Sequence, residues 1–156
     1  MTDPTATFAE LHRAADELAG ARLFTVTAID RAAGVARRAY SSHPADYPVT
    51  GTKPMRDSDW SAQVIGRGES FVANSTAAFA PFFPDHALIN ALGCAAAMNI
   101  PVLDGGIVRG TVNVLDVEGH FTPARVAALE ALVARHSPDI LAALAALLKE
   151  PPHDKA

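Results

Sequence analysis

The sequence contains a single cysteine, Cys94, among its 156 residues. One thiol cannot close a disulfide within the chain, which excludes a disulfide-stapled secreted domain and favours a reducing compartment. Residues 1–10 lack the basic start and apolar run of a signal peptide, and no stretch of eighteen consecutive apolar residues occurs. We therefore expect a cytoplasmic protein that is neither exported nor inserted in a membrane.

Basic residues are few and scattered. Thirteen Lys and Arg stand against seventeen Asp and Glu, which gives a net charge of −4. Nucleic-acid binding is not expected, because a phosphate backbone needs a gathered basic surface. The pair Arg37-Arg38 falls on an expected strand and is interpreted as part of a solvated face.

Sequence motifs for catalysis and metal binding are also missing. The chain has no P-loop, no Gly-x-Ser-x-Gly and no His-Glu-x-x-His. Its six histidines show no spacing typical of metal ligands. We predict no catalytic residue and no metal site; enzyme activity stays undecided, and the sequence favours its absence.

What the chain does have is the composition of one folded domain. Apolar residues make up 49% and charged residues 19%, the balance of an ordinary globular protein. A capping box at Thr7 and Glu10 predicts an N-terminal helix over about 7–19. Thr122-Pro123 predicts the start of a C-terminal helix over about 122–149, with an interruption near Pro138 and a disordered tail at 150–156.

Residues 22–117, between the two helices, are the expected sheet and pocket region, and several stretches within it alternate in the period of two that is typical of strands. Asp104-Gly105-Gly106 predicts a tight hairpin turn before the last strand. A proline-rich irregular loop is expected at 41–55, with short helices following it. The predicted strands lie near 24–28, 35–42, 70–73, 96–102 and 107–116. This order predicts an antiparallel sheet with helices on its faces, an α+β fold.

One stretch resembles a known family. Four features are similar to the C-terminal signature of GAF domains. They are a strand ending in Asn99-Ile100-Pro101-Val102, the turn that follows, the strand residues from Val108 to Val114 including Gly110, and the step Phe121-Thr122 before a long helix. The resemblance implies a PAS-related antiparallel sheet of five to six strands with helices on both faces. It also implies that residues 1–156 form a single domain of this kind.

GAF domains are sensory modules, and their pocket lies over one sheet face, under the irregular loop and the helix before the fourth strand. The resemblance therefore implies a pocket that combines an apolar lining with a few polar groups. The candidate ligand-binding residues are Tyr40, Tyr47, Trp60, Arg67, Asn74, Ser75, Phe82, Phe83 and Asn99. The alternative is that these aromatic side chains only close the core. Asn113 and Asn99 can bind a ligand or simply lie on a wet face.

The leading hypothesis is a small-molecule-binding regulatory domain whose ligand and cofactor are unknown. The apolar stripe of the C-terminal helix predicts a homodimer formed through the N- and C-terminal helices. One alternative is a small enzyme related to the free methionine sulfoxide reductases of this family. That chemistry needs a second cysteine to resolve a sulfenic acid, and Cys94 has no such companion. The other alternative is a dimerisation module that binds no ligand.

Overall fold

The computed structural model describes residues 3–49 and 52–149, and it contains one six-stranded sheet. The strand order is β3-β2-β1-β6-β5-β4, and every neighbouring pair is antiparallel. The strands are β1 (Leu23–Asp30), β2 (Val35–Ser41), β3 (Thr52–Pro54), β4 (Phe71–Ala73), β5 (Ala96–Asp104) and β6 (Ile107–Asp116). The α+β fold with an antiparallel sheet is confirmed. Strand β3 was not predicted, because it lies in the loop that was expected to be irregular.

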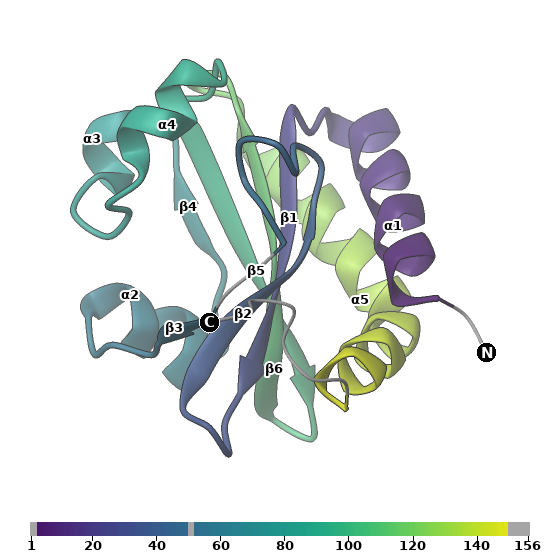
Figure 1. Cartoon of the computed structure of the whole chain (residues 1–156). Helices are drawn as coiled ribbons and strands as arrows, with labels where there is room; N and C mark the ends of the chain where they lie inside the picture. Colours follow the sequence, from purple (N-terminus) through teal and green to yellow (C-terminus); the bar gives the residue numbers. More distant parts are fainter. Residues whose placement is uncertain (1–2, 50–51, 150–156) are drawn as a thin grey trace.

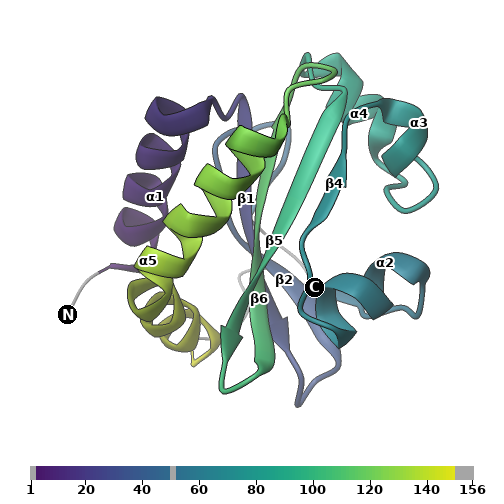
Figure 2. The ribbon, with the colours of Figure 1, turned by 180° about the vertical axis from the view of Figure 1, so that it is seen from behind.

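Helices cover both faces of the sheet (Figures 1 and 2). Two long helices, α1 (Pro4–Ala19) and α5 (Pro123–Leu148), lie side by side on one face. The other face carries α2 (Asp59–Ser61), the π-helical turn Ala62–Gly66, α3 (Thr76–Phe79) and α4 (His86–Ala91). The two faces differ in kind, since one is closed by long helices and the other is crossed by short ones.

Helix α1 begins earlier than predicted. Asp3 is the N-cap and its side chain accepts a hydrogen bond from the backbone N–H of Thr5, while Pro4 occupies the first turn. Thr7 and Glu10, which were expected to form a capping box, lie inside the helix. Asp followed by Pro is itself a strong start signal, so the earlier of two competing signals sets the boundary.

Helix α5 runs unbroken from Pro123 to Leu148, so the predicted interruption at Pro138 is wrong. Buried side chains before and after the proline, such as Val133 and Ile140, hold both halves on the sheet. Tertiary packing thus outweighs the lost backbone hydrogen bond. Within the described residues α5 is also the one helix long and apolar enough to cross a membrane, with a mean hydropathy of 1.4 over eighteen residues, of which 33% are buried.

The main core lies between the sheet and this helix pair. Its largest buried side chains include Phe8, Phe24, Met98, Leu129 and Leu144. A close approach occurs at the early part of β6, where Gly110 faces α5. A Cβ atom there would lie 2.5 Å from the carbonyl oxygen of Thr27 and 2.8 Å from Leu144 Cδ1. Glycine is therefore required at this position for space.

Arg37 corrects another expectation. Its side chain is 6% exposed and its Nη1 donates to the carbonyl oxygen of Leu147 at 3.2 Å, near the end of α5. A guanidinium suits this place because the last carbonyls of a helix have no partner within the helix. The adjacent Arg38 is half-buried and contributes to the opposite face of β2. Neither arginine belongs to a solvated face.

Candidate functional site

A cavity of about 910 Å³ lies on the sheet face away from α1 and α5. Strands β1, β2, β5 and β6 form its floor, and residues 52–61 and 80–85 form its walls. Several wall residues are exposed, including Lys53 and Arg56, so the cavity reaches the protein surface. Its volume falls at the upper end of the range of small-molecule sites.

The floor carries a chain of polar side chains that crosses three strands. Asn99 Nδ2 donates to Asn113 Oδ1 at 2.8 Å, and Asn113 Nδ2 donates to the hydroxyls of Thr25 and Thr27 at 3.1 Å each. The register explains the arrangement, because Asn99 lies opposite Asn113 and Asn113 lies opposite Thr25. Asn99 and Asn113 are 5% and 8% exposed, so neighbouring residues cover most of their surface.

Trp60 joins this chain from the wall. Its indole Nε1 donates to Asn99 Oδ1 at 2.9 Å. A capping box between Ser58 and Ser61 starts α2 and so fixes the turn that carries the indole. The ring of Trp60 also meets Phe83 edge to face, with centroids 6.4 Å apart. The polar floor and the aromatic wall therefore meet at Trp60.

The rest of the aromatic wall comes from α3 and the turn after it. Phe79 is fully buried and packs on Phe83, with ring centroids 5.4 Å apart. Phe71 of β4 contacts both Phe82 and Phe83. Phe82 and Phe83 are half-buried and line the cavity, while Phe79 and Phe71 support them from behind. This wall offers π faces and edges to an apolar ligand.

Arg38 is the inner cation of the cavity. Its guanidinium stands 4.1 Å over the ring of Tyr47, and its Nη1 donates to the carbonyl oxygen of Pro48. Burial lowers the pKa of Arg38, while the nearby Asp85 carboxylate acts in the opposite direction. No ion pair within the described residues neutralises this arginine. The site thus contains a partly desolvated positive charge.

The predicted pocket residues separate into two groups. Tyr47, Trp60, Phe82, Phe83 and Asn99 line the cavity. Tyr40, Arg67, Asn74 and Ser75 do not. The sequence analysis also missed Thr25, Thr27, Arg38 and Thr111 of the floor. Threonines at alternate positions between apolar residues of one strand were the available signal, since alternate side chains share a face.

Tyr40 lies on the other face of the sheet. It packs near Phe8, His12 and Phe24, and burial raises its pKa. Arg38 and Tyr40 would share a face in a regular strand, but the register between β1 and β2 shifts after Val26, so that Thr27 lies opposite Arg38 and Val26 opposite Tyr40. This bulge turns Tyr40 toward the helices.

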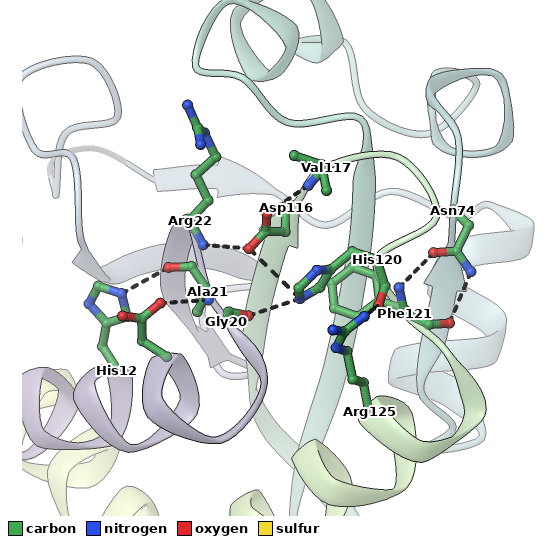
Figure 3. Close-up of polar contacts among 11 residues, drawn as sticks. His12, Gly20, Ala21, Arg22, Asn74, Asp116, Val117, His120, Phe121 and Arg125 are labelled. Carbon is green, nitrogen blue, oxygen red and sulfur yellow. Dashed lines mark hydrogen bonds and ion pairs between the residues drawn. The ribbon is translucent and has the colours of Figure 1, made fainter.

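Asn74 connects the end of β4 to the start of α5, as Figure 3 shows. Its Oδ1 accepts from the backbone N–H of Phe121 at 2.8 Å, and its Nδ2 donates to the carbonyl oxygen of the same residue at 3.1 Å. Ser75 is the N-cap residue of α3, and Arg67 pairs with Glu69 on the surface. These three residues have structural surroundings away from the cavity.

A second polar cluster lies where α1, β1 and β6 meet (Figure 3). Asp116 Oδ2 accepts from the backbone N–H of Arg22 at 3.1 Å and lies 3.7 Å from His120 Nε2. The same imidazole nitrogen is 3.1 Å from the carbonyl oxygen of Gly20, at the end of α1. Arg22 Nε donates to the carbonyl oxygen of Leu92, just after α4. The cluster therefore connects the end of α1 with the helix that borders the cavity.

Cys94 is enclosed rather than reactive. Its residue is 1% exposed, and burial, with a smaller contribution from Asp116, raises its pKa to about 11. A thiol with this pKa is almost wholly protonated at neutral pH, which makes it a poor nucleophile. Among the described residues, no group of three or more His, Cys, Asp or Glu side chains could hold a metal ion.

Comparison with known proteins identifies the family. The GAF domain model matches residues 1–135, so the chain belongs to the GAF domain family. Domains of this family commonly bind small molecules in sensing. No curated protein sequence matches the chain.

Solved structures show the same fold at low sequence identity. The GAF domain/HD domain protein from Geobacter sulfurreducens is 15% identical with a TM-score of 0.72, over 90% of this chain and 94% of that one. The GAF domain of a phosphoenolpyruvate-protein phosphotransferase from Coxiella burnetii is 16% identical with a TM-score of 0.68, over 96% and 86%. The GAF-B domain of DevS from Mycobacterium smegmatis is 15% identical with a TM-score of 0.63, over 95% and 100%.

Proposed function

We propose that this chain is a sensory GAF domain that binds a small molecule in the cavity between the sheet and the short helices. The observation that carries the proposal is the hydrogen-bonded chain from Trp60 through Asn99 and Asn113 to two threonines at the cavity floor. Buried amides in a closed core lower stability unless each is satisfied. Their placement at the base of a large cavity fits a recognition surface.

The proposal includes a homodimer formed through α1 and α5. The outward face of α5 carries exposed alanines along its length, including Ala127, Ala131, Ala134, Ala142 and Ala145. Small side chains let two helices approach closely, and only 33% of the most apolar window of α5 is buried within one chain. A second copy placed on this face would cover apolar surface. The cytoplasm remains the proposed location, on the argument from the lone thiol.

The two alternatives fit the site less well. A reductase mechanism through Cys94 needs an accessible thiolate, whereas this thiol is buried and its pKa is raised to about 11. A dimerisation module without a ligand would have its pocket filled by side chains, whereas about 910 Å³ is open here. Ligand binding is therefore the function that the geometry supports best.

Native mass spectrometry of gently purified protein tests the proposal. The wild-type chain is expected as a dimer that carries a constant extra mass. Ala36, which lines the cavity from β2, provides the matched variant. Ala36→Trp should lose the adduct because the indole occupies the site, whereas Ala32→Trp, in the exposed hairpin, should keep it. An adduct that survives Ala36→Trp would place the ligand elsewhere and contradict the proposal.

A further inference from the structure

The direction of the polar chain on the cavity floor is set by one residue. The indole of Trp60 has a donor and no acceptor. The atom of Asn99 that faces it at 2.9 Å is therefore the carbonyl oxygen. The amide nitrogen of Asn99 must then face Asn113, and Asn113 can accept this hydrogen bond only with its own carbonyl oxygen. Neither asparagine can be turned over without placing two like groups against each other.

This direction ends at two hydroxyl groups. Asn113 Nδ2 donates one hydrogen each to Thr25 Oγ1 and Thr27 Oγ1, so both oxygens act as acceptors for the amide. Within the described residues, neither hydroxyl makes another side-chain hydrogen bond. Each threonine still has its own proton to donate. The floor thus presents two hydroxyl protons that a hydrogen-bond acceptor can bind, while each oxygen also keeps one lone pair.

A basic residue lies on the strand next to these donors. Thr27 lies directly opposite Arg38 in the β1–β2 pair, and both residues line the cavity. The other charged lining residues are Lys53, Arg56, Asp57 and Asp85. Asp85 is half-buried, whereas the other three are exposed at the rim. Cations outnumber carboxylates in the lining, in contrast to the net charge of −4 of the whole chain. The acceptor that suits this corner is accordingly an anionic one.

The remaining lining determines the shape of the ligand. Trp60, Phe82 and Phe83 stand over the floor. Phe83 contacts Trp60, Phe71 and Phe79, and Phe82 meets Phe71 edge to face. A flat ring can contact such a wall at low cost in conformational freedom, and aromatic pairs add to the gain from area burial. The polar floor and the aromatic wall together fit a planar molecule with one charged edge.

We propose that the ligand is an aromatic carboxylate whose carboxylate lies on the hydroxyls of Thr25 and Thr27 beside Arg38 and whose ring lies against Trp60 and Phe83. This inference rests on the proposed function, because it names the class of molecule that the same cavity binds.

The experiment uses matched fragments that share one ring and differ in one substituent. Benzene, pyridine and indole rings each carry a carboxylate, a carboxamide or an aminomethyl group, and binding to the full chain is followed by NMR chemical shifts. The carboxylates are expected to bind at least tenfold more tightly than the aminomethyl compounds, with shifts at the amides of β1 and β6. The affinities of the carboxamides should lie between those of the carboxylates and the aminomethyl compounds.

Two variants test the origin of the preference. Thr27→Val keeps the shape of the strand residue and removes one hydroxyl, so carboxylate affinity should fall about tenfold while aminomethyl binding stays the same. Trp60→Phe keeps a ring but removes the donor that directs the chain, so the carboxylate preference should fall at least threefold. Thr7→Val, on α1 across the sheet, makes the same side-chain change away from the cavity and should leave all affinities as they are.

The outcomes separate the two proposals. Equal or tighter binding of the aminomethyl series would overturn the aromatic-carboxylate inference while leaving the cavity as a binding site. If no fragment at millimolar concentration shifts any amide of the cavity strands, the binding function itself is contradicted. Because the wild-type preference is measured without any substitution, the inference stays testable even where a variant fails to fold.

Discussion

The side-chain amide of Asn74 pairs with the backbone of Phe121 through two hydrogen bonds, 2.8 Å and 3.1 Å long. The amide imitates a strand neighbour and anchors the segment that leads into α5 to the end of β4. The residue that the sequence analysis placed in a ligand pocket is thus a structural clamp between segments 47 residues apart. Its contribution to stability can be measured directly.

Replacing Asn74 by alanine should lower the free energy of unfolding by about 1–3 kcal/mol, because it leaves the N–H and C=O of Phe121 without these partners. Asn74→Asp keeps the acceptor but places a carboxylate oxygen against the carbonyl oxygen of Phe121, so it should also destabilise the protein at neutral pH. Urea denaturation measures both. Ser75→Ala is the adjacent control, since the Ser75 side chain makes no capping hydrogen bond to α3; a loss as large as that of Asn74→Ala would contradict the clamp.

Gly110→Ala should destabilise the protein by about 1–3 kcal/mol, the usual cost of overpacking. The added methyl would lie 2.5 Å from a backbone oxygen of β1, which cannot move as a flexible side chain could. Gly66→Ala is the matched control, because its nearest neighbour would be 3.8 Å away. Thermal unfolding followed by circular dichroism compares the two. Equal unfolding temperatures for both variants would show that β1 and α5 can move apart to accommodate the added methyl group.

Cys94 should make stability fall as the solution becomes alkaline. The thiol pKa is about 11 in the folded protein against an ordinary 9.0, so between these values the unfolded chain loses its proton first. The folded state then binds more protons, and stability decreases as pH rises through this window. From pH 8 to pH 10.5 the wild type should lose about 1–2 kcal/mol more than Cys94→Ala, as measured by urea denaturation at each pH. An equal loss of stability in the wild type and in Cys94→Ala would contradict the raised pKa of the Cys94 thiol.

The proposed dimer predicts a specific effect of charge on α5. Ala131 is exposed midway along the alanine face. Ala131→Glu should convert the dimer to a monomer in light scattering after size exclusion, with little change in the circular dichroism spectrum, because a carboxylate cannot be buried unpaired between two helices. Ala32→Glu, in the hairpin between β1 and β2, should remain dimeric. A monomeric wild type at micromolar concentration would contradict the homodimer.

The fold followed from local signals that agreed with one another. Alternation marked β1, β5 and β6, Thr122 and Pro123 marked the start of α5, and the turn at Gly105 and Gly106 marked the hairpin between β5 and β6. The start of α1 was misplaced at Thr7 because the signal at Asp3 and Pro4 was overlooked. Pro138 shows the converse, since a local helix breaker was overruled by packing on both sides of it.

The site was less accessible to sequence reasoning because it depends on register. Trp60 and Asn99 could be proposed from residue type and approximate position, but their hydrogen bond requires the pairing of distant strands. Tyr40 was misplaced because a bulge turns the side chains that follow it to the other face of the sheet, and residue composition gives no signal of such a bulge. Arg38 was overlooked because its burial depends on Tyr47, nine residues away in a loop.

Gly110 gives the sheet a property that the cavity and the helix pair share. At this position only a backbone separates Leu144 of α5 from Thr27, whose carbonyl faces the glycine and whose hydroxyl faces the cavity. Here the wall between the two compartments of the domain is a single layer of main chain, with no side chain to absorb a displacement. A molecule that moved Thr27 by a fraction of an ångström would therefore also displace the backbone against which Leu144 of α5 packs.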